Sequence, residues 1–307
     1  EPAGAYGVTR LTGSEDVYLR PDVVIQPLVD RWYAWSHLVP PCTLALNHLE
    51  RHLRIMDSYV DAPEVHAAAA ADPMMAGGPF IDLDGERSDD IKELAEHIRR
   101  QRAGLLALGP ALRVLSELLA TSARGYSLDP LYAVVAPVLR GYVELFYDVE
   151  DRAGFRLLEP LLYAGPHGDA DAQSVAVFAV DEEARPFVLS TPSLDGDDRV
   201  HLDLPFASPE VDQIARLRSR PRPWGEVADL LDDGAGDRSD CIRGLVTTTP
   251  PRSPEPYTGP GLRWRYFGHA CVLVEAGGVS VLTDPLVAYG GDGSVPRYTL
   301  HDLPETV

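Results

Sequence analysis

The stretch "YFGHACVLVEAGGVSVLTDPLV", residues 266–287, carries the clearest structural signal in the chain. Apolar residues dominate both sides of the pair Gly277-Gly278, and glycines suit the positive backbone φ angles of a tight turn. The second half ends on Asp284-Pro285. The pattern predicts two β-strands around a glycine turn, with a carboxylate at the end of the second strand.

Three elements of this stretch occur in a familiar order: a strand that contains GHA, a glycine turn, and a strand that ends in TDP. Together they resemble the opening of a metallo-β-lactamase-fold domain of the lactonase-like branch. The resemblance implies that a downstream HxHxDH motif binds two metal ions, a donor set that suits divalent first-row metals. No HxHxDH occurs in the 307 residues. We therefore expect the metal ligands beyond Val307, no catalytic residue in this chain, and no metal or cofactor bound to it.

The same resemblance suggests roles for Asp284 and His269. Asp284 would support the metal site by accepting hydrogen bonds from the metal-binding loop and fixing its shape. Alternatively, it only forms the turn before Pro285. His269 would line the mouth of the site, or it would simply cap its strand. The residues themselves leave both alternatives open.

An acidic and proline-rich segment precedes this region. Residues 232–240 read "DDGAGDRSD", and five of the eleven residues from 250 to 260 are proline. Such a composition excludes helix or sheet interior and favours an extended spacer. We predict an N-terminal domain over 1–231, a linker over 232–261, and the incomplete start of a second domain over 262–307.

Helical periodicity dominates the first half of the N-terminal domain. Apolar residues recur every three or four positions over 41–60, as on one buried face of an amphipathic helix. Ser88 predicts an N-cap for a helical region that runs to about 123, with an interruption near Gly109-Pro110. A proline at the first helical position predicts a further helix over 129–145.

After residue 150 the periodicity changes to alternation. Short strands are predicted at 174–180, 186–190 and 199–205, followed by a helix that begins at Ser208-Pro209. Helices followed by a small, mostly antiparallel sheet make an α+β N-terminal domain. The complete expectation is this domain followed by the first β-hairpin of a metallo-β-lactamase αββα sandwich, truncated here.

Composition excludes several classes of function. The net charge is −20, with 47 acidic and 27 basic residues, so the surface repels nucleic acids and anionic membranes. We expect no apolar run to reach the roughly 18 residues of a membrane-spanning helix. The N-terminus has no signal-peptide pattern. Three scattered cysteines are no disulfide framework and favour a reducing cytoplasm. Serine-hydrolase, dinucleotide and P-loop motifs do not occur.

The N-terminal domain itself carries a more specific resemblance. It rests on six segments that occur in order, among them "IQPLVDRWYAWSHLVPP" (25–41), "LRGYVELFYDVED" (139–151) and "RPFVLSTPSLDGDDRVHLDLPF" (185–206). These segments resemble the N-terminal domain of the diiron β-hydroxylase of chloramphenicol biosynthesis and its relatives. The resemblance covers most of residues 25–230 and continues across the linker.

That family implies a non-haem diiron monooxygenase that activates O2 and hydroxylates the β-carbon of an amino acid. The amino acid is held as a phosphopantetheine thioester on the carrier domain of a nonribosomal peptide synthetase. The family also implies a homodimer, to which Trp32, Tyr33 and Trp35 would contribute if they are not core residues. One rival is a zinc- or manganese-dependent hydrolase of the same fold, which fold alone does not exclude. Another is a non-catalytic dimerisation and docking module.

Two further clusters of polar residues are candidate sites. "HLERH" places His48 and His52 four residues apart on one helix face, a spacing that can bind zinc, but Glu50 is out of register with HExxH and no third ligand is evident. We interpreted the pair as a polar helix flank. Four arginines could steer an acidic carrier domain, or could simply pair with nearby acids on a solvated helix end. They are Arg216, Arg218, Arg220 and Arg222.

Overall fold

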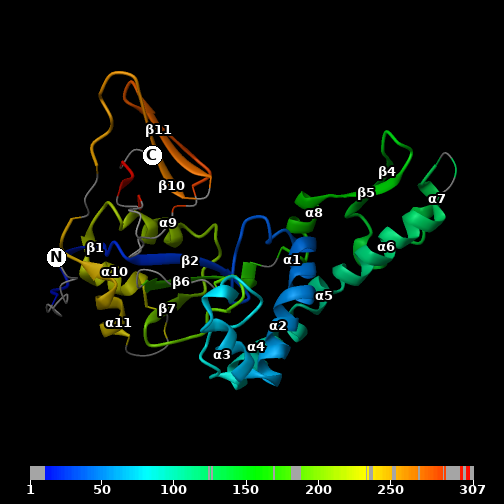
Figure 1. The fold of residues 1–307 in the computed structure, drawn as a ribbon, viewed down its shortest axis with the longest axis horizontal. Coiled ribbons are helices and arrows are strands. Elements are labelled where there is room, and N and C mark those ends of the chain that lie inside the picture. The colour runs from blue at the N-terminus through cyan, green and yellow to red at the C-terminus, as the bar shows by residue number, and fades with distance from the viewer. Residues whose placement is uncertain are drawn as a thin grey trace. The chain divides into compact units, whose positions relative to one another are not determined.

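The fold was examined in a computed structural model, which divides into two compact units (Figure 1). Unit 1 comprises residues 1–26, 174–185 and 195–307, and unit 2 comprises residues 27–173 and 186–194. The division predicted from the sequence, with boundaries at 231 and 261, stays a prediction. The structure describes residues 11–304 apart from residues 124, 126, 169, 181–187, 233, 235–237, 251–253, 269, 286, 288–297 and 300–301.

In the described residues, unit 1 combines short antiparallel strands with helices. A three-stranded sheet has the order β8-β1-β9, and a four-stranded sheet has the order β3-β2-β6-β7, in which β6 pairs antiparallel with β7. The unit boundaries fall inside β2 and β6. The strands of these two sheets are β1 (Asp16–Leu19), β2 (Val23–Val29), β3 (Trp32–Tyr33), β6 (Gln173–Ala179), β7 (Arg199–Leu202), β8 (Arg222–Pro223) and β9 (Val246–Thr247). Of these, β3 belongs to unit 2. The helices are α9 (Pro209–Arg216), α10 (Trp224–Leu230) and α11 (Ser239–Gly244).

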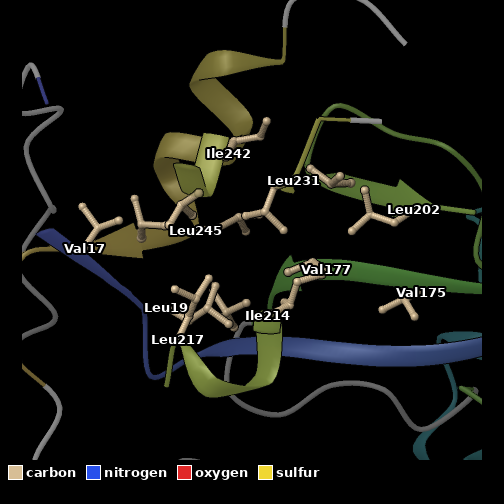
Figure 2. Packing of buried hydrophobic residues seen from close by; sticks show 14 of the residues in the cluster. Val17, Leu19, Val175, Val177, Leu202, Ile214, Leu217, Leu231, Ile242 and Leu245 are labelled. Atoms are coloured by element: carbon tan, nitrogen blue, oxygen red, sulfur yellow. The ribbon is translucent and has the colours of Figure 1, made fainter. Parts of the chain in front are cut away.

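One apolar cluster forms the core of unit 1 (Figure 2). Alternate residues of β1 and β6 point into it, as do the apolar faces of α9 and α11. Removal of such surface from water is the main favourable term in folding. The labelled members are Val17, Leu19, Val175, Val177, Leu202, Ile214, Leu217, Leu231, Ile242 and Leu245.

A separate antiparallel sheet of order β10-β11-β12 lies in the C-terminal part of unit 1. Its strands are β10 (Leu262–Gly268), β11 (Cys271–Ala276) and β12 (Val279–Thr283). The glycine turn at 277–278 is confirmed, because Ala276 pairs with Val279 across it. The expectation of only two strands was wrong: the stretch from 262 to 276 folds back on itself, and Gly268, with a φ of 108°, ends the first strand.

Unit 2 is mainly helical. Its helices begin with α1 and α2, between which His48–His52 forms one π-helical turn, η1. A two-stranded antiparallel hairpin, β4-β5, follows the longest helices. The elements are α1 (Pro41–Asn47), α2 (Leu53–Asp61), α3 (Pro63–Ala70), α4 (Ser88–Gln101), α5 (Ala103–Leu106), α6 (Leu108–Ser122), α7 (Asp129–Tyr132), β4 (Val143–Tyr147), β5 (Ala153–Leu157) and α8 (Glu159–Ala164), with short 3-10 turns at 73–75, 137–139 and 170–172.

Two apolar clusters hold unit 2 together. One joins α1, α5 and α6 to β4 and α8, with Leu108, Leu139 and Leu162 fully buried. The other joins α2 to α4 around Met56 and Ile91. The helices thus bury the faces that their three- and four-residue apolar spacing predicts.

Several local predictions need correction. Ser88 is the first helical residue rather than the N-cap, which is Arg87 with a φ of 62°. The helical region breaks at Arg102 and Ala107, not at Gly109-Pro110, because proline is tolerated in the first turn of α6. The region 16–33, which carried no predicted element, forms β1, β2 and β3.

The largest correction concerns the helix predicted over 129–145. Only α7 is α-helical there, and β4 begins at Val143 after Gly141, which adopts a φ of 84°. The strand predicted at 174–180 is confirmed by β6, and that at 199–205 by β7 over a shorter range. The strand predicted at 186–190 lies partly outside the described residues, and residues 188–190 form a turn.

One helical stretch is longer and more apolar than the sequence reading allowed. Residues 103–122 form a helical stretch that by length and composition alone could cross a membrane. The stretch carries Arg113 and Glu117, and its apolar residues Leu108, Leu112 and Leu115 belong to a core cluster of unit 2. Buried core helices commonly have this composition, so the stretch is weak evidence for a membrane span.

Candidate functional site

The β10-β11-β12 sheet has two very different faces. On one face, strand register aligns Trp264 with Val274 and Val281, and Leu262 with Ala276 and Val279. The large side chains of this apolar sheet face are exposed: Leu262, Trp264, Tyr266, Val279 and Val281 are between 53% and 66% accessible. An apolar face of this size on an isolated sheet is typical of a surface that packs against something else.

The opposite face is covered and contains a buried ion cluster. Phe267, Cys271 and Leu273 form a small core there. Glu275, only 1% exposed, accepts hydrogen bonds from Arg263 Nε and Nη2, both at 2.8 Å. Arg265 Nη2 lies 3.3 Å from the same carboxylate. Hydrogen bonding to Arg263 and the charge of Arg265 outweigh burial and lower the pKa of Glu275.

This cluster also holds the end of the proline-rich segment. The backbone N–H of Tyr257 donates to Glu275 at 3.3 Å, and the Arg263 guanidinium lies over the Tyr257 ring at 4.8 Å from its centre. Sequence reasoning missed this cluster. Its signal was the pair of arginines on alternate positions of β10, opposite a single glutamate on β11, which becomes visible only once the strands are in register.

Asp284 follows β12 directly, with an exposed side chain and a φ of 40°. The preceding residue fixes its position, because Thr283 Oγ1 donates to the carbonyl oxygen of Ala270 at 3.0 Å. Burial, and then the nearby Asp284 carboxylate, raise the pKa of the Cys271 thiol. The predicted support of a metal loop by Asp284 stays a prediction, and His269 lies outside the described residues.

The arginine cluster at 216–222 separates into two kinds of residue. Arg218 donates to the carbonyl oxygen of Val23 at 2.7 Å, and Arg222 donates to Gln213 Oε1 at 2.8 Å. These two side chains therefore have contacts inside unit 1. Arg216 and Arg220 are exposed on the surface. The docking role predicted for the four arginines stays a prediction.

His48 and His52 are buried, which contradicts their interpretation as a polar helix flank. Their exposed fractions are 0% and 4%, and their Nδ1 atoms lie 2.8 Å apart. His48 Nε2 lies 3.0 Å from Asp30 Oδ2, and Arg102 Nε donates to Asp30 Oδ1 at 2.8 Å. His52 Nε2 lies 3.1 Å from Asn47 Nδ2. The sequence could not show this arrangement, because Asp30 and Arg102 are distant along the chain.

The aromatic residues predicted for a dimer interface lie beside this cluster. Trp32 is buried and stacks on His52, with ring centres 3.8 Å apart and an interplanar angle of 5°. Trp32 is therefore a core residue of unit 2. Tyr33 and Trp35 are half-buried and meet edge to face at 5.4 Å. Homodimerisation stays a prediction.

The described residues do not fit a diiron centre. Within them, no group of three or more His, Cys, Asp or Glu side chains is arranged to hold a metal ion. A metal pair needs several such ligands per ion.

Comparison with known proteins identifies the family. The family model described as the diiron non-heme beta-hydroxylase N-terminal domain matches residues 18–250. The 4-amino-L-phenylalanyl-[CmlP-peptidyl-carrier-protein] 3-hydroxylase of Streptomyces venezuelae is 36% identical over 302 residues, which cover 94% of this chain and 55% of that protein.

Solved structures agree with this match. The crystal structure of CmlA, a diiron beta-hydroxylase from Streptomyces venezuelae, superposes with a TM-score of 0.80 at 35% identity, covering 95% of this chain and 55% of that one. A CmlA mutant structure gives a TM-score of 0.76 at 34% identity, covering 94% of this chain and 55% of that one. The chain thus spans about half the length of the relatives it matches. On these grounds the chain belongs to the family of diiron non-heme beta-hydroxylase N-terminal domains.

Proposed function

We propose that this chain is the N-terminal part of a non-haem diiron, O2-dependent monooxygenase that hydroxylates the β-carbon of a carrier-tethered amino acid. The observation that carries the proposal is the extent of the match to a carrier-protein-dependent 3-hydroxylase, which reaches from the N-terminal domain through β10-β11-β12. A match across both the first domain and the following sheet favours the hydroxylase over a hydrolase of the same fold.

In this proposal the β10-β11-β12 sheet begins a metallo-β-lactamase-fold catalytic domain. The apolar sheet face supports it, since Leu262, Trp264 and Val281 would become interior residues once further elements cover them. The covered face already has its own core and the Glu275 ion cluster. Asp284 at the end of β12 would then support a metal-binding loop, and His269 would lie at the site's mouth.

Arg216 and Arg220 would guide the acidic carrier domain. Arg216 ends α9 and Arg220 follows it by four residues; both are exposed, in a chain whose net charge is −20. A local positive patch offsets the general repulsion of an acidic partner and raises the association rate. Arg218 and Arg222, which contact unit 1 internally, would contribute less.

The direct test uses the full-length gene product. Purified without chelator, it should contain iron rather than zinc, and with an aminoacylated carrier, O2 and a reductant it should add one oxygen atom to the amino acid. Mass spectrometry with isotopically labelled O2 identifies the source of that atom. Stoichiometric zinc together with ester or lactone hydrolysis would instead identify the hydrolase.

A second experiment tests carrier docking separately. In the full-length protein, Arg216→Gln with Arg220→Gln should weaken carrier binding and reduce its dependence on salt, while the unfolding midpoint stays unchanged. The matched control is Arg113→Gln, an exposed arginine on α6 that pairs with Glu50. Equal carrier binding by the double variant and the control would refute the docking role without touching the oxygenase proposal.

A further inference from the structure

The strongest unexplained feature is the buried cluster of Asp30, Asn47, His48, His52 and Arg102 in unit 2. Its histidines occupy a π-helical turn, a local irregularity that is frequent at functional sites. Asp30 occupies the tip of the β2-β3 turn with a φ of 48°, followed by Arg31 with a φ of 69°. Two unusual backbone segments are thus joined by one set of side chains.

Hydrogen-bond directions define one complete arrangement with neutral imidazoles. Asn47 Nδ2–H donates to His52 Nε2, His52 Nδ1–H donates to His48 Nδ1, and His48 Nε2–H donates to Asp30 Oδ2. Arg102 Nε–H donates to the other carboxylate oxygen. Every ring nitrogen then has a partner, as buried polar groups require.

A second complete arrangement exists with one more proton. If His48 carries protons on both nitrogens, its Nδ1–H donates to His52 Nδ1, and His52 then carries its proton on Nε2. That proton needs an acceptor, which the Asn47 amide oxygen supplies after a half-turn of the amide group. The two arrangements differ in the direction of two hydrogen bonds and in the Asn47 atom that faces His52 Nε2, which is Nδ2 in the first and Oδ1 in the second.

We propose that this cluster is a single-proton switch built into unit 2. A proton from hydronium adds to His52 Nε2, where half-buried Asn47 is the outermost member, and the proton on His52 Nδ1 passes to His48 Nδ1. Two N–H bonds form, one N–H bond and one hydronium O–H bond break, and water is released. The Asn47 amide turns to accept from His52 Nε2, and the cluster gains one positive charge.

The surrounding charges set the balance between the two arrangements. Asp30 stabilises a charged His48, whereas Arg102, across the same carboxylate, and Arg51, on η1, oppose an added positive charge. Burial, followed by the charges of His48 and Arg51, holds the pKa of His52 well below its ordinary value. The proposal places the added proton on His48 because its Nε2 atom already faces Asp30 Oδ2 at 3.0 Å.

The backbone of the Asp30-Arg31 turn is hydrogen-bonded to two other segments of the chain. The backbone N–H of Asp30 donates to the carbonyl of Ala172 at 2.8 Å, and that of Ser193 donates to the carbonyl of Arg31 at 2.7 Å. Ala172 and Ser193 each lie within two residues of a point where the chain passes between the units. A change at Asp30 reaches these segments through two hydrogen bonds.

Nitrogen-15 NMR of the histidine-labelled chain tests the proposal, with His48→Gln and His52→Gln used to assign the signals. At alkaline pH, His52 should be the Nδ1–H tautomer and His48 the Nε2–H tautomer. On acidification, His52 should change to the Nε2–H tautomer at the same midpoint at which His48 becomes doubly protonated. Independent titration of the two rings, an unchanged His52 tautomer, or unfolding before any change would each overturn the proposal.

A substitution at Asn47 distinguishes proton uptake by the cluster from a purely structural role of its residues. Asn47→Asp supplies an acceptor and a negative charge but no donor, so it should favour the proton-loaded arrangement and raise the switch midpoint by about 1–3 pH units. His97→Gln, an exposed histidine on α4, should leave the midpoint unchanged. An Asn47→Asp midpoint equal to that of the unsubstituted chain would contradict the proposal.

Discussion

Two tight turns in this chain have similar backbone geometry, but one consists of two glycines and the other of two charged residues. Gly277-Gly278 joins β11 to β12 with φ angles of 57° and 80°, and Asp30-Arg31 joins β2 to β3 with φ angles of 48° and 69°. Both are two-residue hairpin turns with positive φ at both central positions, which glycine adopts readily and other residues do not. Local preference stabilises the first turn and opposes the second.

The difference shows that the Asp30-Arg31 turn is held from a distance. Asp30 contributes its carboxylate to His48 and Arg102, and the backbone of the turn is bonded to Ala172 and Ser193. A left-handed conformation costs about 1–2 kcal/mol at each non-glycine residue. Such strain persists where the surrounding structure outweighs it, and it commonly marks a position whose side chain has a role.

The largest expected effect is loss of the anchor at Asp30. Asp30→Asn should destabilise unit 2 by about 3 kcal/mol or more, because removal of one partner leaves Arg102 buried without its counter-charge. Hydrogen exchange of the segment from 27 to 61, followed by mass spectrometry, measures this loss. Glu144→Gln breaks the exposed pair with Arg156 in the same unit and should cost less than about 1 kcal/mol. If Asp30→Asn and Glu144→Gln lose the same amount of stability, the buried contacts of Asp30 do not hold its turn more strongly than an exposed ion pair would.

The next effect is a pH dependence of stability that is confined to the segment around the Asp30-Arg31 turn. The pKa of His52 is lower in the folded chain than its ordinary 6.5, so the unfolded chain takes up the proton first. Its contribution to stability is therefore present above pH 6.5 and falls on acidification, by at most about 1.4 kcal/mol per pH unit. His52→Gln should remove this slope from segment 27–61 and leave the segment around Gly277 unaffected. A slope that survives in His52→Gln would assign it to another group.

Titration of Asp30 should extend the loss of folding stability to lower pH. Burial alone would raise its pKa, but hydrogen bonding to His48 and the charges of His48 and Arg102 outweigh burial and lower the pKa below 3.8. A lowered carboxylate pKa stabilises the folded state above 3.8, and this contribution disappears as pH falls through the folded value. The acid limb of the stability profile should therefore have two parts, with His52 first and Asp30 second.

The two turns also separate what a sequence can and cannot reveal. Gly277-Gly278 was predictable because its signal is local: two glycines between apolar, alternating runs. Asp30-Arg31 was not, since it breaks the local preference and depends on Arg102, 72 residues away. The helix wrongly predicted over 129–145 shows the same limit, because the three- and four-residue apolar spacing continues to residue 145 although α7 ends at Tyr132 and β4 begins at Val143.

Candidate site residues followed the same rule. The sequence singled out Asp284 and the four arginines by their local pattern. The structure separates Arg218, which contacts Val23 far along the chain, and Arg222, which contacts nearby Gln213, from Arg216 and Arg220. Glu275 went unnoticed, since a single glutamate in an apolar strand becomes informative only when Arg263 and Arg265 lie opposite it.

A smaller effect is expected at the glycine turn. No heavy atom lies within 4 Å of a Cβ placed on Gly278, so Gly278→Ala tests the backbone alone. Its φ of 80° should make the change cost about 1 kcal/mol or slightly more. Exchange of segment 262–283 should accelerate accordingly, while segment 27–61 serves as the internal control. An unchanged exchange rate would mean that the turn relaxes to another conformation.

The smallest effect comes from relieving the strained turn itself. Arg31, with a φ of 69°, carries the strain without holding Asp30's position in the cluster, so Arg31→Gly should remove the steric cost of the left-handed conformation. The gain is reduced by the greater freedom of glycine in the unfolded chain and by the side-chain contacts that Arg31 gives up. The net change should be a stabilisation of segment 27–61 by no more than about 1 kcal/mol.

Arg31→Asn tolerates the same backbone conformation, and its stability should fall between that of Arg31→Gly and that of the unsubstituted chain. Arg31→Ala keeps the strain but deletes the same contacts, and it should destabilise. If all three substitutions destabilise equally, the Arg31 side chain rather than the backbone determines the turn, and the contrast with Gly277-Gly278 would rest on Asp30 alone.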